Sequence, residues 1–323
     1  MGSIITLSIV QSALELGLIY GLVALALFLS FTILNIADLS TDGCFTLGCA
    51  VCARVTLAGH PVLALFAALS AGVCSGFVTA FLQTRLGVRS ILAGIIVNTG
   101  LYTINIAAMG FASNLNLFGC ASIFTWAKAA VGGTWYKLIV AAAIVTVVGV
   151  FIWIFLSTRL GLSIRATGDN PDMVLSSGIR TGAMITVGLC AANALTALSG
   201  GLLAQYQKSC DINLGTGMVT IALASLMIGE TIVGKGGILK CVAGAVLGSC
   251  LYRFMVALAL RANVPAECLK LVSALIVALA IALPYLKKQM AFYRQRRRAK
   301  AENALYLREI TGEIQSGEGG GGR

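Results

Sequence analysis

The sequence predicts an all-α polytopic membrane protein. Of its 323 residues, 58% are hydrophobic and 11% are charged, and the mean hydropathy is +0.93. Soluble domains carry about 25% charged residues, so a single soluble core could not bury this much apolar chain. Segments such as Leu138 to Leu156 stay apolar over the roughly 20 residues that cross a bilayer, which favours helices over barrel strands.

Apolar runs separated by glycine, polar or basic breaks predict about 8–10 transmembrane helices. The predicted spans are 14–36, 43–58, 61–82, 91–112, 137–157, 183–204, 218–233, 239–260 and 267–286. Lys and Arg gather in every second connection, and the first 53 residues contain neither. Because cytoplasmic connections carry the excess of Lys and Arg, we expect the N-terminus outside and the C-terminus in the cytoplasm.

The order of the spans indicates an inverted repeat. Four spans precede the one at 137–157 and four follow it, so the two groups have opposite orientations. Each group opens with a long span, continues through an acid-bearing break (35–42 and 205–217) and enters a short span. Interrupted segments in matching positions are typical of a transport pathway at the repeat interface. The alternative is that short helices simply occur in many multi-span proteins.

Polar and acidic side chains within these segments are the candidate pathway residues, because lipid would not tolerate them. The substrate-pathway candidates are Asp38, Thr41, Asp42, Asn98, Tyr102, Asn105, Gln205, Tyr206 and Glu230. For Asp38 and Asp42 the alternative is an exposed cytoplasmic loop. For the helically spaced Asn98, Tyr102 and Asn105 the alternative is hydrogen bonding between helices.

No pattern in the chain predicts catalysis, a metal site or a cofactor. The run Gly229 to Gly236 nearly matches a phosphate-binding loop, but Gly236 stands where the Mg²⁺-binding Ser or Thr is required, and an apolar helix precedes it. The ten cysteines fall mostly inside apolar segments, where cysteine packs as a small hydrophobe. We therefore expect a chain that does not itself hydrolyse ATP.

The cytoplasmic segment 158–181 is longer than a connection requires. Asp169 or Asn170 can cap a short helix with Pro171 at its first position and Gly178 at its end. Such a helix outside the membrane predicts docking to a soluble partner; the alternative is a helix lying on lipid.

The chain divides into a membrane domain, 1–286, and a basic cytoplasmic tail, 287–323. Basic residues cluster in this tail directly after the last apolar run, without the interleaved aromatic residues of a nucleic-acid platform. We expect it to lie near anionic membrane lipid and not to bind nucleic acid. Its Gly-rich end is typical of a partly disordered segment.

The segment 158–181 resembles the coupling region of the permease family shared by branched-chain amino-acid, ribose and nucleoside ABC importers. Within that family, the stretches 33–48, 203–207 and 215–230 look like the branch associated with tryptophan and tyrosine uptake in Firmicutes. The similarity covers nearly all of residues 10–286.

This resemblance implies a type II ABC importer permease in a bacterial cell membrane. Its expected partners are a second permease copy, two ATPase subunits that hold ATP and Mg²⁺, and an extracytoplasmic substrate-binding lipoprotein. The residues expected to couple to the ATPase are Arg165, Thr167, Gly168, Asp169, Asn170, Pro171, Met173 and Ser177. Two alternatives stay open: an ion-coupled secondary transporter using Asp38, Asp42 or Glu230, and an ABC permease for a sugar or nucleoside.

Overall fold

The computed structural model describes residues 7–234 and 236–261, and beyond them only 271, 274, 275, 278, 279, 282, 286, 289, 290 and 292–297. The chain forms two compact units, Met1–Val277 and Ala278–Arg323. Most of the predicted span 267–286 and of the basic tail therefore lies outside the described residues, and the predicted boundary at 286 stays a prediction.

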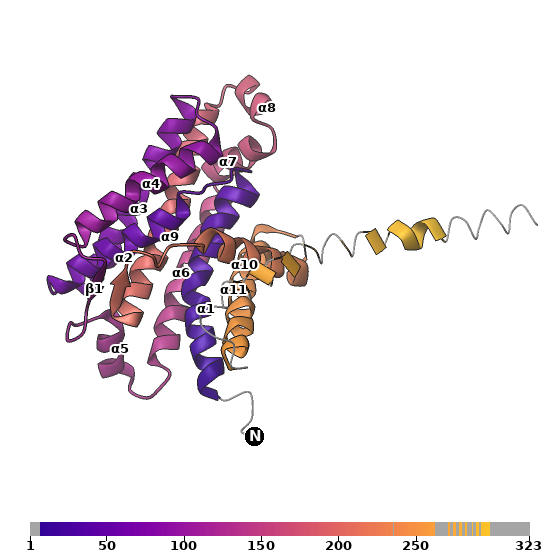
Figure 1. Cartoon of the computed structure of the whole chain (residues 1–323). Helices are drawn as coiled ribbons and strands as arrows, with labels where there is room; N and C mark the ends of the chain where they lie inside the picture. Colours follow the sequence, from indigo (N-terminus) through magenta and orange to yellow (C-terminus); the bar gives the residue numbers. More distant parts are fainter. Residues whose placement is uncertain are drawn as a thin grey trace, which may run out of the picture. The chain divides into compact units, whose positions relative to one another are not determined.

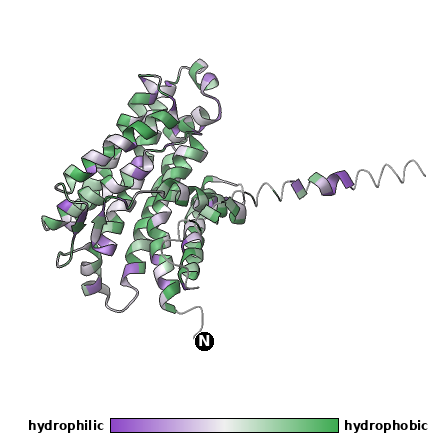
Figure 2. Ribbon diagram, viewed as in Figure 1, coloured by the Kyte–Doolittle hydropathy of each residue, from purple (hydrophilic) through white to green (hydrophobic). Residues whose placement is uncertain are grey.

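Within the described residues, six helices are long and apolar enough to cross a membrane. They are α1 (Leu7–Leu27) with its π-helical continuation η1 (Phe28–Ile33), α3 (Pro61–Thr84), α4 (Ser90–Ala108), α6 (Tyr136–Ser157), α9 (Thr181–Gln207) and α11 (Ile238–Arg261). Figure 2 shows these helices coloured mostly as hydrophobic. The all-α polytopic class is confirmed, and each of these helices overlaps a predicted span.

Two shorter helices, α2 (Thr41–Leu57) and α10 (Met218–Val233), match the short spans predicted after the acid-bearing breaks. Small residues let the helices approach closely. A side chain at Gly17 would meet the α11 backbone at Cys250, and one at Gly248 would overlap the Ser225 carbonyl of α10. Ser249 Oγ donates to the Gly17 carbonyl at 2.7 Å, so α1 and α11 share a hydrogen bond as well as close packing.

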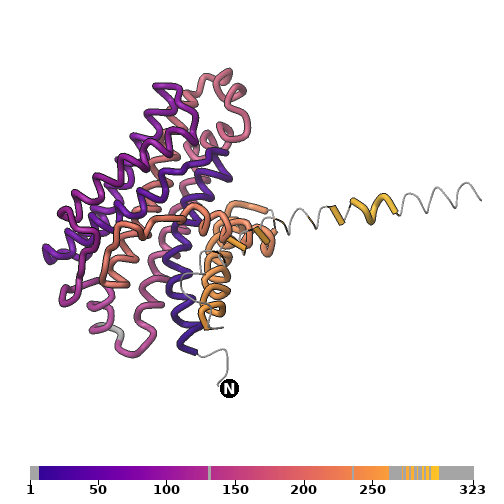
Figure 3. Tube along the Cα trace, viewed as in Figure 1, coloured from indigo at the N-terminus to yellow at the C-terminus, as the bar shows by residue number. Residues whose placement is uncertain are grey.

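The inverted repeat is visible in how the two halves begin. The Ser199 hydroxyl in the second half of α9 donates a hydrogen bond to the Ile19 carbonyl of α1, and Gly188 in the first half of α9 packs against Leu34, just beyond η1. Helices α1 and α9 therefore run antiparallel. Soon after each helix the chain adopts a left-handed backbone at a non-glycine residue, Asn35 (φ 55°) and Lys208 (φ 56°). An irregular segment and a short helix follow in both halves, as the trace in Figure 3 shows.

The two ends of the first unit carry different small elements (Figure 1). At one end lie α7 (Arg159–Asp169) and α8 (Pro171–Ser176), and at the other lie α5 (Ile123–Val131) and the antiparallel strands β1 (Asn114–Asn116) and β2 (Ser209–Asp211). The connection between α4 and α6 therefore contains regular structure. Ser122 and Thr125 form a capping box that starts α5, and β1 finds its partner almost a hundred residues later.

Candidate functional site

The first break, residues 34–40, is not a fully exposed loop, because Leu34, Asp38 and Ser40 are buried while Asn35 is exposed. Asp38 is buried, and its Oδ1 accepts hydrogen bonds from the Ser40 N–H at 2.8 Å and the Ser40 hydroxyl at 2.6 Å. Its Oδ2 accepts from Asn193 Nδ2 at 2.9 Å. Asn193 lies near the midpoint of α9, a helix about 40 Å long. Thus α2 starts near the middle of a membrane-spanning helix.

The second break, residues 208–217, folds back along α2. Gln205 Nε2 lies 3.4 Å from Thr56 Oγ1 near the end of α2, and Cys210 packs with Cys49 in one buried cluster. Further along, the Gly215 N–H donates to Thr46 Oγ1 at 3.1 Å. Later residues of the break thus contact earlier residues of α2. This re-entrant segment, residues 208–217, therefore carries the chain from the end of α2 back to its start.

Asp42, in the first turn of α2, links the start of α2 to the end of the second break. Its Oδ2 accepts from the Gly217 N–H at 2.9 Å and its Oδ1 from the Val219 N–H at 2.9 Å. These are amides of the first turn of α10, which otherwise lack intrahelical partners. A carboxylate at the positive end of a helix is stabilised by the helix dipole. The N-termini of α2 and α10 therefore meet around one partly buried acid.

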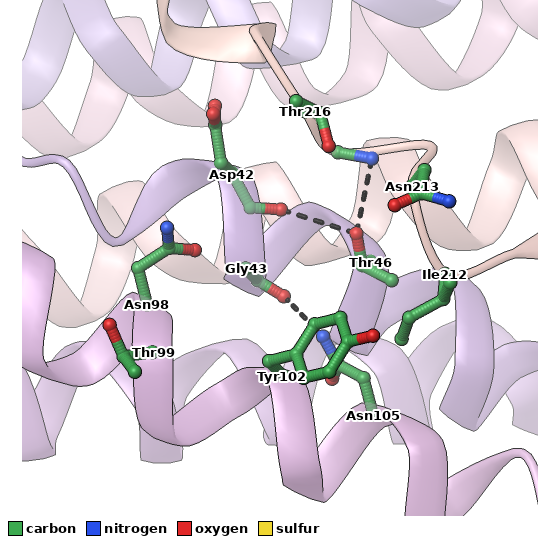
Figure 4. A pocket seen from close by; sticks show the side chains of 11 residues that line it. Asp42, Gly43, Thr46, Asn98, Thr99, Tyr102, Asn105, Ile212, Asn213 and Thr216 are labelled. Carbon is green, nitrogen blue, oxygen red and sulfur yellow. Dashed lines mark hydrogen bonds between the residues drawn. The ribbon is translucent and has the colours of Figure 1, made fainter. Parts of the chain in front are cut away.

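A cavity of about 350 Å³ lies where the broken helices meet α4. Helix α2 contributes Asp42, Gly43 and Thr46; α4 contributes Asn98, Thr99, Tyr102 and Asn105; the re-entrant segment contributes Gly215 and Thr216, with Ile212 and Asn213 beside them. Figure 4 shows Asn98, Tyr102 and Asn105 reaching from α4 toward Gly43 and Thr46 of α2. The spacing of 98, 102 and 105 does place these side chains along one cavity.

The lining offers neutral hydrogen-bonding groups. Asn105 is 1% exposed, and its Nδ2 donates to the Gly43 carbonyl at 3.0 Å, while its Oδ1 has no partner in the described part of the chain. A buried acceptor without a donor is costly, so this oxygen suits a donor from a bound molecule or water. The one carboxylate in the lining, Asp42, is already engaged by α10. The site can hold a polar solute without requiring the solute to carry a net charge.

The remaining pathway candidates lie outside this cavity. Thr41 is buried and donates to the Asp38 carbonyl at 3.1 Å. Gln205 accepts from the Ile123 N–H and donates to the Pro61 carbonyl, and Tyr206 donates to Glu15 Oε2 at 2.8 Å. Glu230 is in the last turn of α10. A pathway role for these residues stays a prediction.

The short capped helix predicted within 158–181 is present as α8, and its docking role stays a prediction. Asn170 is its N-cap, accepting from the Met173 N–H at 3.1 Å, Pro171 is its first residue, and Gly178 (φ 80°) lies just beyond its end. A second helix, α7, precedes it and holds Arg165, Thr167, Gly168 and Asp169. Sequence analysis missed α7, because two glycines weaken its helical pattern. A side chain at Gly168 would overlap the Ile33 carbonyl, so α7 packs directly against η1.

Sequence analysis also missed part of the cavity lining. Thr46 lies four residues after Asp42, one helical turn along α2, so the helical period could have indicated it. Asn213 and Thr216 carried no such signal, because only the fold-back of the re-entrant segment brings them to α4.

Broken helices that meet near the middle of a membrane-spanning bundle, with a polar cavity between them, define a transport protein. The chain belongs to the family described as branched-chain amino acid transport system / permease component, which matches residues 9–282. It is thus a permease of the ABC importer family, a multi-pass membrane transport protein and not an enzyme.

Curated relatives differ in what they are named for. The chain is 33% identical to a tyrosine transport system permease protein of Clostridioides difficile (strain R20291) over 267 residues, 82% of this chain and 88% of the relative. It is 26% identical to the autoinducer 2 import system permease protein LsrC of Escherichia coli O9:H4 (strain HS) over 251 residues, 75% and 69% of the two chains. No solved structure matches at comparable significance.

Proposed function

We propose that the chain is the membrane subunit through which an ABC importer moves an aromatic amino acid of the tyrosine or tryptophan type. The observation that carries this proposal is the cavity between α2, α4 and the re-entrant segment, lined by amide and hydroxyl groups. An aromatic amino acid is a zwitterion with a large apolar face, so it needs hydrogen-bonding groups for its ends and an apolar or aromatic wall for its ring. Tyr102 and Ile212 supply such a wall. The name of the Clostridioides relative supports the same cargo.

Separate ATPase subunits that hold ATP and Mg²⁺ would convert the energy. An extracytoplasmic binding protein and a second copy of this chain would complete the importer. The end of the bundle that carries α7 and α8 would face the cytoplasm, with the N-terminus outside. Met173 and Leu175 of α8 are 67% and 62% exposed. Apolar side chains on a short capped helix outside the bundle suit a groove on a soluble subunit better than water.

A series of contacts connects α7 and α8 to the cavity. Helix α7 touches η1 through Gly168 and Ile33, and only the first break separates η1 from the start of α2. A displacement of α7 by the ATPase would therefore act on the segment that holds Asp38 and Asp42.

A sugar, nucleoside or similar polyol is the second candidate cargo. The lining supports it as well, since amides and hydroxyls also bind hydroxyl groups. The name of the LsrC relative indicates that cargo differs among members of the wider family.

Uptake by the complete system, reconstituted in vesicles, tests the proposal. Tyrosine or tryptophan should accumulate with ATP, and ribose and adenosine should neither accumulate nor compete. Asn98→Ala should lower uptake while leaving substrate binding by the soluble partner unchanged. Thr103→Ala, an exposed position on the same helix outside the cavity, is the control. Transport of a sugar or nucleoside alone would contradict the cargo.

A further inference from the structure

A second cavity, of about 700 Å³, lies between the end of α3 and the start of α9. Arg85, the C-cap of α3, and Arg180, the N-cap of α9, line it together with Thr84 and Thr186. Phe77 and Phe81 of α3 line its other part. It is separate from the cavity at Asp42, and the proposed transport function makes no use of it.

The lining changes from cationic to apolar along both helices. On α3, Phe77, Phe81 and Arg85 follow one another at four-residue spacing, so they lie on one face of the helix. Phe77 lies about 12 Å further along the axis of α3 from its C-terminal end than Arg85. On α9, Arg180 starts the helix, and Ala183 and Val187 follow into the apolar part. Along both neighbouring helices, the lining of the cavity therefore changes from cationic to apolar in the same direction.

The cationic end has features that suit an anion. Both arginines lie at the surface, and an arginine guanidinium matches a phosphate with paired N–H donors. The start of α9 adds the positive end of a 27-residue helix. The hydroxyls of Thr84 and Thr186 line the cavity but donate to backbone carbonyls of their own helices, so the two arginines and the start of α9 carry the attraction for an anion. A side chain at Gly182 would meet Thr84 Cβ at 3.4 Å, so the two helices approach closely beneath the arginines.

The apolar end suits hydrocarbon. Phe77 and Phe81 are 55% and 45% exposed and pack with ring centroids 6.4 Å apart. A soluble anion would leave these rings unused, whereas a simple hydrocarbon would leave two guanidiniums without a counter-charge. An amphipathic anion satisfies both ends at once.

We propose that this cavity binds an anionic phospholipid, with the phosphate between Arg85 and Arg180 and an acyl chain over Phe77 and Phe81. Basic pockets between helices at a membrane surface are known to favour anionic headgroups. The bound lipid would hold the end of α3 against the start of α9, the helix whose midpoint binds Asp38.

The test is titration of the full-length protein in neutral detergent with short-chain phosphatidylglycerol, followed by native mass spectrometry. Phosphatidylcholine and soluble glycerol 3-phosphate are titrated in parallel. Phosphatidylglycerol should bind more tightly than either. Each arginine replaced by glutamine should weaken binding roughly fivefold, and the double variant Arg85→Gln with Arg180→Gln about thirtyfold.

Arg89→Gln is the matched control, because it removes a nearby positive charge that does not line the cavity. It should bind phosphatidylglycerol as the wild type does, and the double variant Arg85→Lys with Arg180→Lys should keep most of the affinity. If Arg89→Gln lost as much affinity for phosphatidylglycerol as the cavity variants, general surface charge would explain the binding, and the proposal would be overturned. Equal binding of glycerol 3-phosphate would show that the occupant is a soluble phosphate and not a lipid.

Discussion

The carboxylate of Asp42 accepts a hydrogen bond from the backbone N–H of Gly217 at 2.9 Å. Asp42 is in the first turn of α2, directly after the break of the first half of the chain, and Gly217 ends the break of the second half. The bond therefore joins the start of α2 to the end of the second break. Because the carboxylate also accepts from Val219, it fixes the position at which α10 begins.

Removing this carboxylate should destabilise the start of α10. Loss of a capping side chain costs about 1 kcal/mol, and a partly buried charge at a helix end contributes up to about 2 kcal/mol. We expect Asp42→Ala to lower the thermal-unfolding midpoint in detergent and to reduce uptake, and Asp42→Asn, which keeps one acceptor, to have a smaller effect.

Asp211→Ala is the control for that prediction. The Asp211 carboxylate accepts from the nearby Asn213 N–H, within its own segment. It should shift the unfolding midpoint less than Asp42→Ala. Equal shifts for the two alanine variants would mean that Asp42 has no special role at α10.

The contact between the re-entrant segment and α2 depends on Gly215. A Cβ there would overlap the Asp42 carbonyl and Thr46 Oγ1. We expect Gly215→Ala to push the segment away from α2 and to lower both stability and uptake. Gly100→Ala on α4 is the matched change, because a Cβ at Gly100 meets nothing within 4 Å. If Gly215→Ala behaves like Gly100→Ala in thermal unfolding and uptake, the close packing is not required.

The link between α7 and η1 gives a prediction about coupling. Gly168→Val should separate α7 from the Ile33 carbonyl and lower substrate-stimulated ATPase activity of the assembled importer. Uptake should fall with it, while the purified subunit stays folded. Ala166→Val, at an exposed position of the same helix, should leave both activities near wild type. Wild-type ATPase stimulation and uptake in Gly168→Val would show that the contact between α7 and η1 is not needed for coupling.

Much of this fold follows from the sequence because lipid imposes simple rules. A run such as 137–157 must be a helix, and Asp38 and Asp42 between apolar runs had to be sheltered from lipid. The helical period likewise placed Asn98, Tyr102 and Asn105 on one face of α4.

What the sequence could not indicate depends on contacts between distant segments. The three-residue strands β1 and β2 show no alternating pattern, and they exist because 114–116 and 209–211 pair. Gln205 and Tyr206 were predicted to line the pathway because they carry polar groups. Their partners, Pro61 and Glu15, are distant in sequence, so only the packed structure shows that they tie helices together.

Uptake by a variant with a filled cavity tests most directly whether solute passes the site at Asp42. Asn98→Trp places a large side chain in a cavity of about 350 Å³, and Leu92→Trp places the same side chain at an exposed position of α4 outside the cavity. ATP-driven tyrosine uptake should be abolished in Asn98→Trp and retained in Leu92→Trp, with equal folding and equal substrate binding by the soluble partner. Normal uptake by a folded Asn98→Trp variant would contradict a pathway through this cavity.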